Sequence, residues 1–130
     1  MSAMDARIQA FYPPHTELGE SPIYREEDGT LHYIDAFGCS IHVLPLSEPK
    51  NARVIRCPEM ISLLCFCEGG GYIVCYFQGV AKVGEDGKWE VLKQIISDEG
   101  KPTKRLNDGA VDSRGRLWFG SFDLYERCRI

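Results

Sequence analysis

The sequence lacks several features that define large classes of protein. No apolar run approaches the roughly 18 residues that a membrane-spanning helix needs. Residues 1–17 contain no apolar core of a secretion signal, so we expect a cytoplasmic protein with no membrane partner. The chain also has no basic run, and its formal net charge is −4. That charge argues against a nucleic-acid partner.

Helical periodicity is missing as well. No segment repeats its apolar residues at the spacing of about 3.6 residues that marks an amphipathic helix. The chain has 130 residues, of which 44% are hydrophobic, so it is long enough to bury a core. We therefore expect an all-β fold.

Zinc-knuckle spacing is absent, although the chain has six cysteines. Cys65 and Cys67 are separated by one residue, whereas zinc-binding pairs are usually separated by about two to four. In a strand, these two thiols would face the same side. In a cytoplasmic protein we expect reduced, packed thiols rather than disulfides or a cysteine metal site.

The sequence does contain a weak repeat of short strands. Gly29, Gly71 and Gly115 each precede a short apolar and aromatic segment, and they lie 42 and 44 residues apart. A period of about 40–50 residues built from short strands is typical of β-propeller blades, which have four strands each. Turn glycines before strands also occur in β-sandwiches, so the period alone leaves both folds open.

The segments around these glycines fill two units of four strands. We expect strands at residues 21–24, 31–35, 40–44 and 52–56, and again at 61–67, 72–77, 80–83 and 88–94. Asp86 and Gly87 predict a hairpin turn. Trp89 and Trp118 are expected in the core. The predicted organisation is an N-terminal arm at residues 1–17, a first blade at 18–57, a second at 58–104 and the start of a third at 105–130.

Residues 18–22 read Leu-Gly-Glu-Ser-Pro. Gly19 permits close backbone approach, and Pro22 suits a strand start or an edge strand. Glu20 would open the innermost strand of the first unit and face the central channel of a propeller. A carboxylate there is a natural ligand for a hard cation. The plainer alternative is a solvated surface carboxylate.

Residues 105–109 read Arg-Leu-Asn-Asp-Gly. If Leu106 points into the core of a blade, Arg105 and Asn107 point together to the other side. A guanidinium beside an amide is suited to binding the hydroxyls or carboxylate of a substrate. The plainer alternative is a polar turn, because Asn-Asp-Gly is common in turns.

These segments, with residues 31–35 and Gly-Arg-Leu-Trp-Phe-Gly at 115–120, resemble the family of regucalcin (senescence marker protein), gluconolactonase and luciferin-regenerating enzyme. The likeness runs from about Thr16 to Ser121. It implies a six-bladed propeller that hydrolyses lactones or related esters, with a small-molecule lactone or sugar acid as the substrate. It also implies one axial divalent cation, calcium or zinc, with magnesium and manganese as alternatives, which polarises the lactone carbonyl and activates water.

The same resemblance assigns roles to four residues. It implies that Glu20 binds the metal and that Arg105 and Asn107 bind substrate. Asp108 is expected to orient these groups without contacting the metal or the substrate itself.

The chain departs from that family in its C-terminal part. It ends after about two and a half blades, so the remaining metal ligands and the catalytic Asp are expected beyond residue 130. The family often continues after Gly120 with a small residue, methionine and acidic residues, whereas residues 121–123 here are Ser-Phe-Asp.

The sequence leaves two functions open. One is a metal-dependent lactonase. The other is a non-catalytic metal-binding or interaction fragment, inactive because later ligands are missing. Whether the chain is an enzyme is not decided by its residues. Open blade edges favour self-association.

Overall fold

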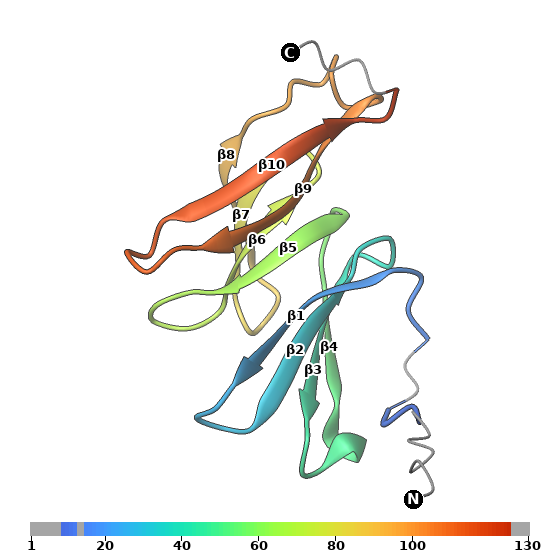
Figure 1. Ribbon diagram of the computed structural model, residues 1–130, viewed down its shortest axis with the longest axis vertical. Coiled ribbons are helices and arrows are strands. Elements are labelled where there is room, and N and C mark those ends of the chain that lie inside the picture. The colour runs from blue at the N-terminus through green and yellow to red at the C-terminus, as the bar shows by residue number, and fades with distance from the viewer. Residues whose placement is uncertain (1–8, 13–14, 126–130) are drawn as a thin grey trace, which may run out of the picture.

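The computed structural model describes residues 9–12 and 15–125, which form ten β-strands and a short 3₁₀ helix, η1 (Pro49–Asn51) (Figure 1). The strands are β1 (Gly19–Arg25), β2 (Thr30–Asp35), β3 (Ser40–Pro45), β4 (Arg53–Arg56), β5 (Ile61–Phe66), β6 (Tyr72–Tyr76), β7 (Gly79–Val83), β8 (Trp89–Gln94), β9 (Lys104–Val111) and β10 (Leu117–Asp123). The all-β prediction is confirmed. Within the described ranges, no helix has the length and hydropathy that crossing a membrane requires.

The strands form three antiparallel sheets (Figure 1). The first sheet has the order β1-β2-β3-β4, the second β5-β6-β7-β8, and the third pairs β9 with β10. Each strand therefore pairs with its neighbour in the sequence, as in propeller blades. Two four-stranded sheets and a two-stranded one amount to the predicted two and a half blades.

The first strand of each sheet lies beside the first strand of the next sheet. β1 contacts β5, and β5 contacts β9, although none of these strands shares a sheet with the others. Figure 1 shows the three strands following one another across the middle of the molecule. These inner strands (β1, β5 and β9) bring residues from distant parts of the sequence together.

The second sheet takes part in both hydrophobic clusters of the core because neighbouring sheets cover both of its faces. Successive residues of a strand point to opposite faces. Leu64 and Val74 pack toward the first sheet, where they meet Ile34. Leu63 and Cys75 pack on the other side, in one cluster with Leu106 of the third sheet. Residues 61–64 are therefore all buried, a pattern typical of a strand covered on both faces.

Each inner strand contains a β-bulge. The residues at the bulges are Ser21–Pro22 in β1, Ser62 in β5 and Asn107–Asp108 in β9. A bulge bends its strand and redirects nearby side chains. The Asn-Asp-Gly segment lies inside β9, so the polar-turn alternative is wrong.

The expected burial of the two tryptophans holds only for Trp89. Trp89 is half-buried and packs against the core, with its ring 5.6 Å from that of Tyr76. Trp118 is 62% exposed, so the core prediction is wrong for this residue. It lies on β10, whose outer face is not covered by another sheet of the described chain.

The Asp112 carboxylate organises the turn between β9 and β10. Its Oδ2 accepts hydrogen bonds from Trp118 Nε1 at 2.9 Å and Arg116 Nε at 2.7 Å. Its Oδ1 accepts from the backbone N–H groups of Arg114 and Arg116. The indole hydrogen bond, followed by those from Arg116, lowers the pKa of Asp112 to about 2. The Gly-Arg-Leu-Trp segment therefore closes a hairpin.

A buried histidine connects the first two sheets. Thr30 donates its hydroxyl hydrogen to Asp28, so His32 Nε2, 2.7 Å away, donates to the Thr30 oxygen. His32 Nδ1 then accepts from the Tyr72 hydroxyl at 2.9 Å. Burial, and then repulsion from Arg25, lowers the pKa of His32 from 6.5 to about 4.

We predict that acidification weakens the fold through His32. Between its ordinary pKa of 6.5 and the folded value of about 4, the unfolded chain takes up a proton that the folded chain refuses. Stability should therefore fall as the pH falls through this window. From pH 7 to pH 5 we expect wild type to lose about 2 kcal/mol more than His32→Gln does, measured by urea unfolding. His15→Gln, at an exposed position, is the control. Equal losses in wild type and His32→Gln would contradict the assignment.

Candidate functional site

A cavity of about 300 Å³ lies where β1, β5 and β9 begin. It brings together three of the predicted site residues, Glu20, Arg105 and Asn107. Its other lining residues are Leu18, Ala36, Phe37, Ser62, Phe77, Leu106 and Phe122. A carboxylate, a guanidinium and an amide therefore share one small cavity, although 85 residues separate Glu20 from Arg105.

Asp35 holds the segment that leads into Glu20. It lies at the end of β2, and only 5% of it is exposed. Its carboxylate accepts hydrogen bonds from the backbone N–H groups of Glu17 and Leu18, both at 3.0 Å. A third comes from Gly38 N at 3.1 Å. The start of β1, and with it Glu20, is therefore fixed to the β2–β3 turn.

These hydrogen bonds keep Asp35 charged in the folded protein. Burial alone would raise the pKa of Asp35, but the backbone N–H groups of Leu18, Glu17 and Gly38 outweigh it and hold the pKa below its ordinary value. Gly38 is required for close approach, because a Cβ at this position would collide with the Asp35 carboxylate.

Leu106 anchors the other side of the cavity. Only 1% of it is exposed, and its backbone N–H donates to Phe77 O at 2.8 Å. Because Leu106 is fixed in the core, its neighbours Arg105 and Asn107 both reach the cavity. Arg105 is half-buried and Asn107 is exposed.

The Arg105 guanidinium contacts two aromatic rings. Its Cζ lies 4.6 Å from the ring centre of Phe77 and 5.2 Å from that of Phe122. No carboxylate of the described chain lies within ion-pair distance of it. The faces of the two phenylalanine rings attract the guanidinium instead, and a contact of this kind stabilises a cation by roughly 0.5–2 kcal/mol.

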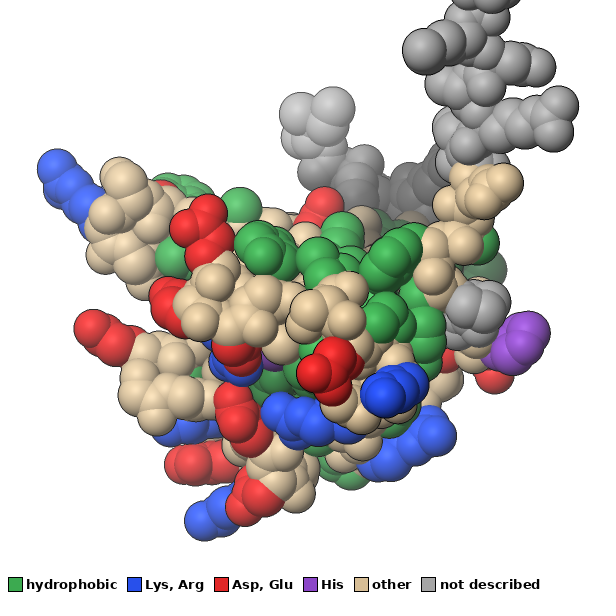
Figure 2. Space-filling view, turned by 90° about the horizontal axis from the view of Figure 1, so that it is seen from below, with side chains coloured by type: hydrophobic (Ala, Val, Ile, Leu, Met, Phe, Trp, Pro, Cys, Tyr) green, Lys and Arg blue, Asp and Glu red, His purple; other side chains and the backbone are tan. Residues whose placement is uncertain are grey.

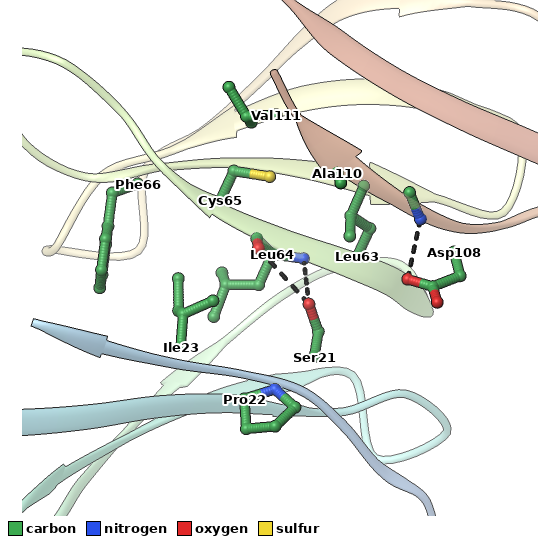
Figure 3. A pocket seen from close by; sticks show the side chains of 11 residues that line it. Ser21, Pro22, Ile23, Leu63, Leu64, Cys65, Phe66, Asp108, Ala110 and Val111 are labelled. Atoms are coloured by element: carbon green, nitrogen blue, oxygen red, sulfur yellow. Dashed lines mark hydrogen bonds between the residues drawn. The ribbon is translucent and has the colours of Figure 1, made fainter. Parts of the chain in front are cut away.

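Ser21 joins β1 to β5 at the bulge beside Glu20. Its hydroxyl accepts from Leu64 N at 2.9 Å and donates to Leu64 O at 3.4 Å (Figure 3). Its φ of +52° is rare for a residue other than glycine. The serine of Gly-Glu-Ser-Pro therefore has a structural role that sequence reasoning missed.

Asp108 lines a different cavity of about 510 Å³, bounded by residues 21–23, 63–66 and 108–111. Figure 3 shows it on the β9 side of this cavity, with Ser21 on the β1 side. Its Oδ1 accepts from Gly109 N at 2.8 Å. Within the described ranges, no hydrogen bond joins it to Arg105 or Asn107. The expectation that Asp108 orients those two residues stays a prediction.

The described residues do not by themselves form a cation site. Among them, no group of three His, Cys, Asp or Glu side chains is placed to hold a metal. Glu20 is the one acidic residue among those that line the smaller cavity. Calcium takes about six to eight oxygen ligands, so Glu20 and the Asn107 amide fall well short.

The family model described as SMP-30/Gluconolactonase/LRE-like region matches residues 18–128. The chain belongs to this family. It is 30% identical over 116 residues to regucalcin of Xenopus laevis, covering 88% of this chain and 38% of that protein. It is 29% identical over 108 residues to 6-deoxy-6-sulfogluconolactonase of Pseudomonas putida, covering 80% of this chain and 35% of that protein.

A solved structure supports the fold independently. A calcium-binding protein, regucalcin, of Agrobacterium tumefaciens str. C58 superposes with a TM-score of 0.72 at 24% identity. The match covers 83% of this chain and 36% of that one. The chain thus spans less than two fifths of the length of the relatives described here, which agrees with an incomplete propeller.

Several residues of the site carried no usable sequence signal. Asp35 ends one of the segments that resemble the family, but its hydrogen bonds to residues 17 and 18 depend on the fold. Ser62 and Phe77 belong to no recognised motif, and they reach the cavity through a bulge and a turn. Phe122 lies just beyond the segments that resemble the family.

We predict that Asp35→Asn destabilises the protein by roughly 3 kcal/mol, because three part-buried hydrogen bonds lose a charged acceptor. The measurement is chemical unfolding near neutral pH. Asp86→Asn is the matched control, since Asp86 accepts one backbone hydrogen bond in an exposed turn. The contribution of Asp35 is present above its ordinary pKa of 3.8 and is lost as the pH falls through its lower folded pKa. Equal effects of the two substitutions would refute this role.

Proposed function

We propose that the chain binds a sugar lactone in the smaller cavity and takes part in its hydrolysis. The observation that supports this most is the convergence of Glu20, Arg105 and Asn107 on one cavity. The family and the lactonase relative support the substrate class. Since the chain spans less than two fifths of these relatives, the activity of a whole propeller is part of the proposal.

The proposed roles follow from the chemistry of the side chains. Hydrolysis adds water to the lactone carbonyl carbon, breaks the ring C–O bond and yields a sugar acid. Arg105 would donate N–H bonds to the carbonyl oxygen, where negative charge develops as water adds. The Asn107 amide would donate to and accept from the hydroxyls, which fixes the sugar relative to Arg105.

The proposal includes a divalent cation only for a form of the protein that supplies further metal ligands at this cavity. Glu20 would be one ligand, and the other ligands, like the carboxylate that takes the proton from water, would have to come from outside the described residues. The calcium-binding regucalcin structure supports a divalent cation, with calcium or zinc as the proposed ions.

The second candidate is a non-catalytic metal-binding or interaction fragment. Large hydrophobic side chains are exposed on the outer strands β8 and β10, including Trp118 at 62% and Val91 at 53%. Figure 2 shows hydrophobic side chains gathered on another face, beside charged ones. Such areas are typical of surfaces that contact other proteins. Self-association through them is part of this candidate.

The test is hydrolysis of glucono-δ-lactone by the 130-residue chain. Proton release is followed in calcium, in zinc and in chelator, with the spontaneous rate subtracted. Where hydrolysis exceeds background, we predict a fall in kcat/KM on the order of 10²-fold in Arg105→Gln, because a donor to the developing oxyanion is lost. Glu20→Gln should also be impaired. Arg114→Gln and Glu26→Gln remove matched charges at exposed positions outside the cavity and should retain activity.

No hydrolysis under any of these conditions would reject the lactonase proposal for this chain and favour the interaction fragment. Activity that survives both Arg105→Gln and Glu20→Gln would reject the site.

A further inference from the structure

Arg105 differs from the arginines whose charge is compensated within the structure. Arg25, Arg53 and Arg116 each pair with a carboxylate. Arg105 is half-buried and, within the described chain, has no hydrogen-bond acceptor and no ionic partner. A guanidinium has five N–H donors in a fixed plane. Its donors are therefore free to meet a ligand in the cavity.

The two rings beside Arg105 are themselves fixed in place. Phe77 lies in the turn between β6 and β7, where its N–H donates to Met60 O and its carbonyl accepts from Leu106 N. Its ring meets that of Phe37 edge-on, with the centroids 6.5 Å apart. Phe122 lies on β10 directly opposite Arg105 in the β9–β10 pairing. Phe77 and Phe122, the aromatic clamp, thus hold the cation from two separate elements.

A clamp of this kind has a specific chemical consequence. A ring face attracts a cation without using any of its N–H donors. A carboxylate in place of the rings would occupy two donors and cancel the charge. The aromatic clamp therefore limits the movement of Arg105 while leaving its charge and its donors available.

We propose that Phe77 and Phe122 are specificity-determining residues that present Arg105 to the carboxylate of a polyhydroxy acid. This inference deepens the proposed function and rests on it for the choice of cavity. The carboxylate would form paired N–H···O bonds with Arg105. Glu20 repels a second anion, so the hydroxyl end of the ligand lies toward Glu20 and Asn107. A cavity of about 300 Å³ suits a ligand of this size.

Phe122 is the half of the clamp that lies on β10. A methionine side chain has no ring face to attract the guanidinium. The substitution Phe122→Met therefore removes half of the clamp while keeping an apolar side chain.

The test compares D-gluconate with the neutral polyol D-glucitol, using titration calorimetry on the 130-residue chain in chelator. We expect gluconate to bind at least about tenfold more tightly than glucitol. The reason is that paired N–H···O bonds between a guanidinium and a carboxylate are stronger than hydrogen bonds to neutral hydroxyls. Phe122→Met and Phe77→Leu should each weaken gluconate binding about three- to tenfold and leave glucitol binding unchanged. Phe66→Leu is the matched control. It removes an aromatic ring 5.6 Å from the Arg25 guanidinium, outside the smaller cavity.

A second measurement does not depend on binding. Protons over a ring face are shifted upfield, so the Arg105 Nε–H resonance, identified by its absence in Arg105→Lys, should move downfield in Phe77→Leu and Phe122→Met. An unmoved resonance in both variants would show that the clamp does not form. Absence of gluconate binding, or equal affinity for gluconate and glucitol, would overturn the specificity assignment.

The outcomes separate this inference from the proposed function. Gluconate binding that depends on the clamp, in a chain with no lactone hydrolysis, would support the clamp and reject the lactonase. Hydrolysis without a preference for gluconate would retain the lactonase and reject the clamp.

Discussion

The hydroxyl of Ser21 forms two hydrogen bonds with the backbone of Leu64, and these bonds join sheets that share no ladder. Without them β1 would be an edge strand with no polar connection to β5 at this point. The Leu106 N–H bond to Phe77 O provides the corresponding connection between the second and third sheets. Because these contacts set the positions of the inner strands, they also determine that Glu20 and Arg105 line the same cavity.

Strand alternation explains how well-packed strands can also present polar side chains to the cavity. Successive residues of a strand point to opposite faces. Ser62 and Asn107 therefore line the cavity, while their neighbours Leu63 and Leu106 belong to the hydrophobic core.

The sequence predicted those features that depend on neighbouring residues. Short apolar runs between turn glycines located the strands, and the resemblance indicated Glu20, Arg105 and Asn107, which the structure brings together. It did not predict the hydrogen bonds of Asp35 or the contacts of Phe77 and Phe122, because they join residues far apart in the chain. The Asn-Asp-Gly segment allowed a turn as an alternative, since the same residues occur in bulges and turns. Trp118 was expected in the core because it is large and apolar, but β10 leaves it exposed.

The described chain thus contains a cavity bounded by the inner strands and, within it, a guanidinium without an ionic partner. The central claim is that these inner strands are held together within this chain. The most direct test is amide hydrogen exchange at Leu64 and Leu106, whose N–H groups bond between sheets. Both amides should exchange slowly in wild type, and Ser21→Ala should accelerate exchange at Leu64 more than at Leu106. Exchange of both amides at unprotected rates in wild type would contradict the account.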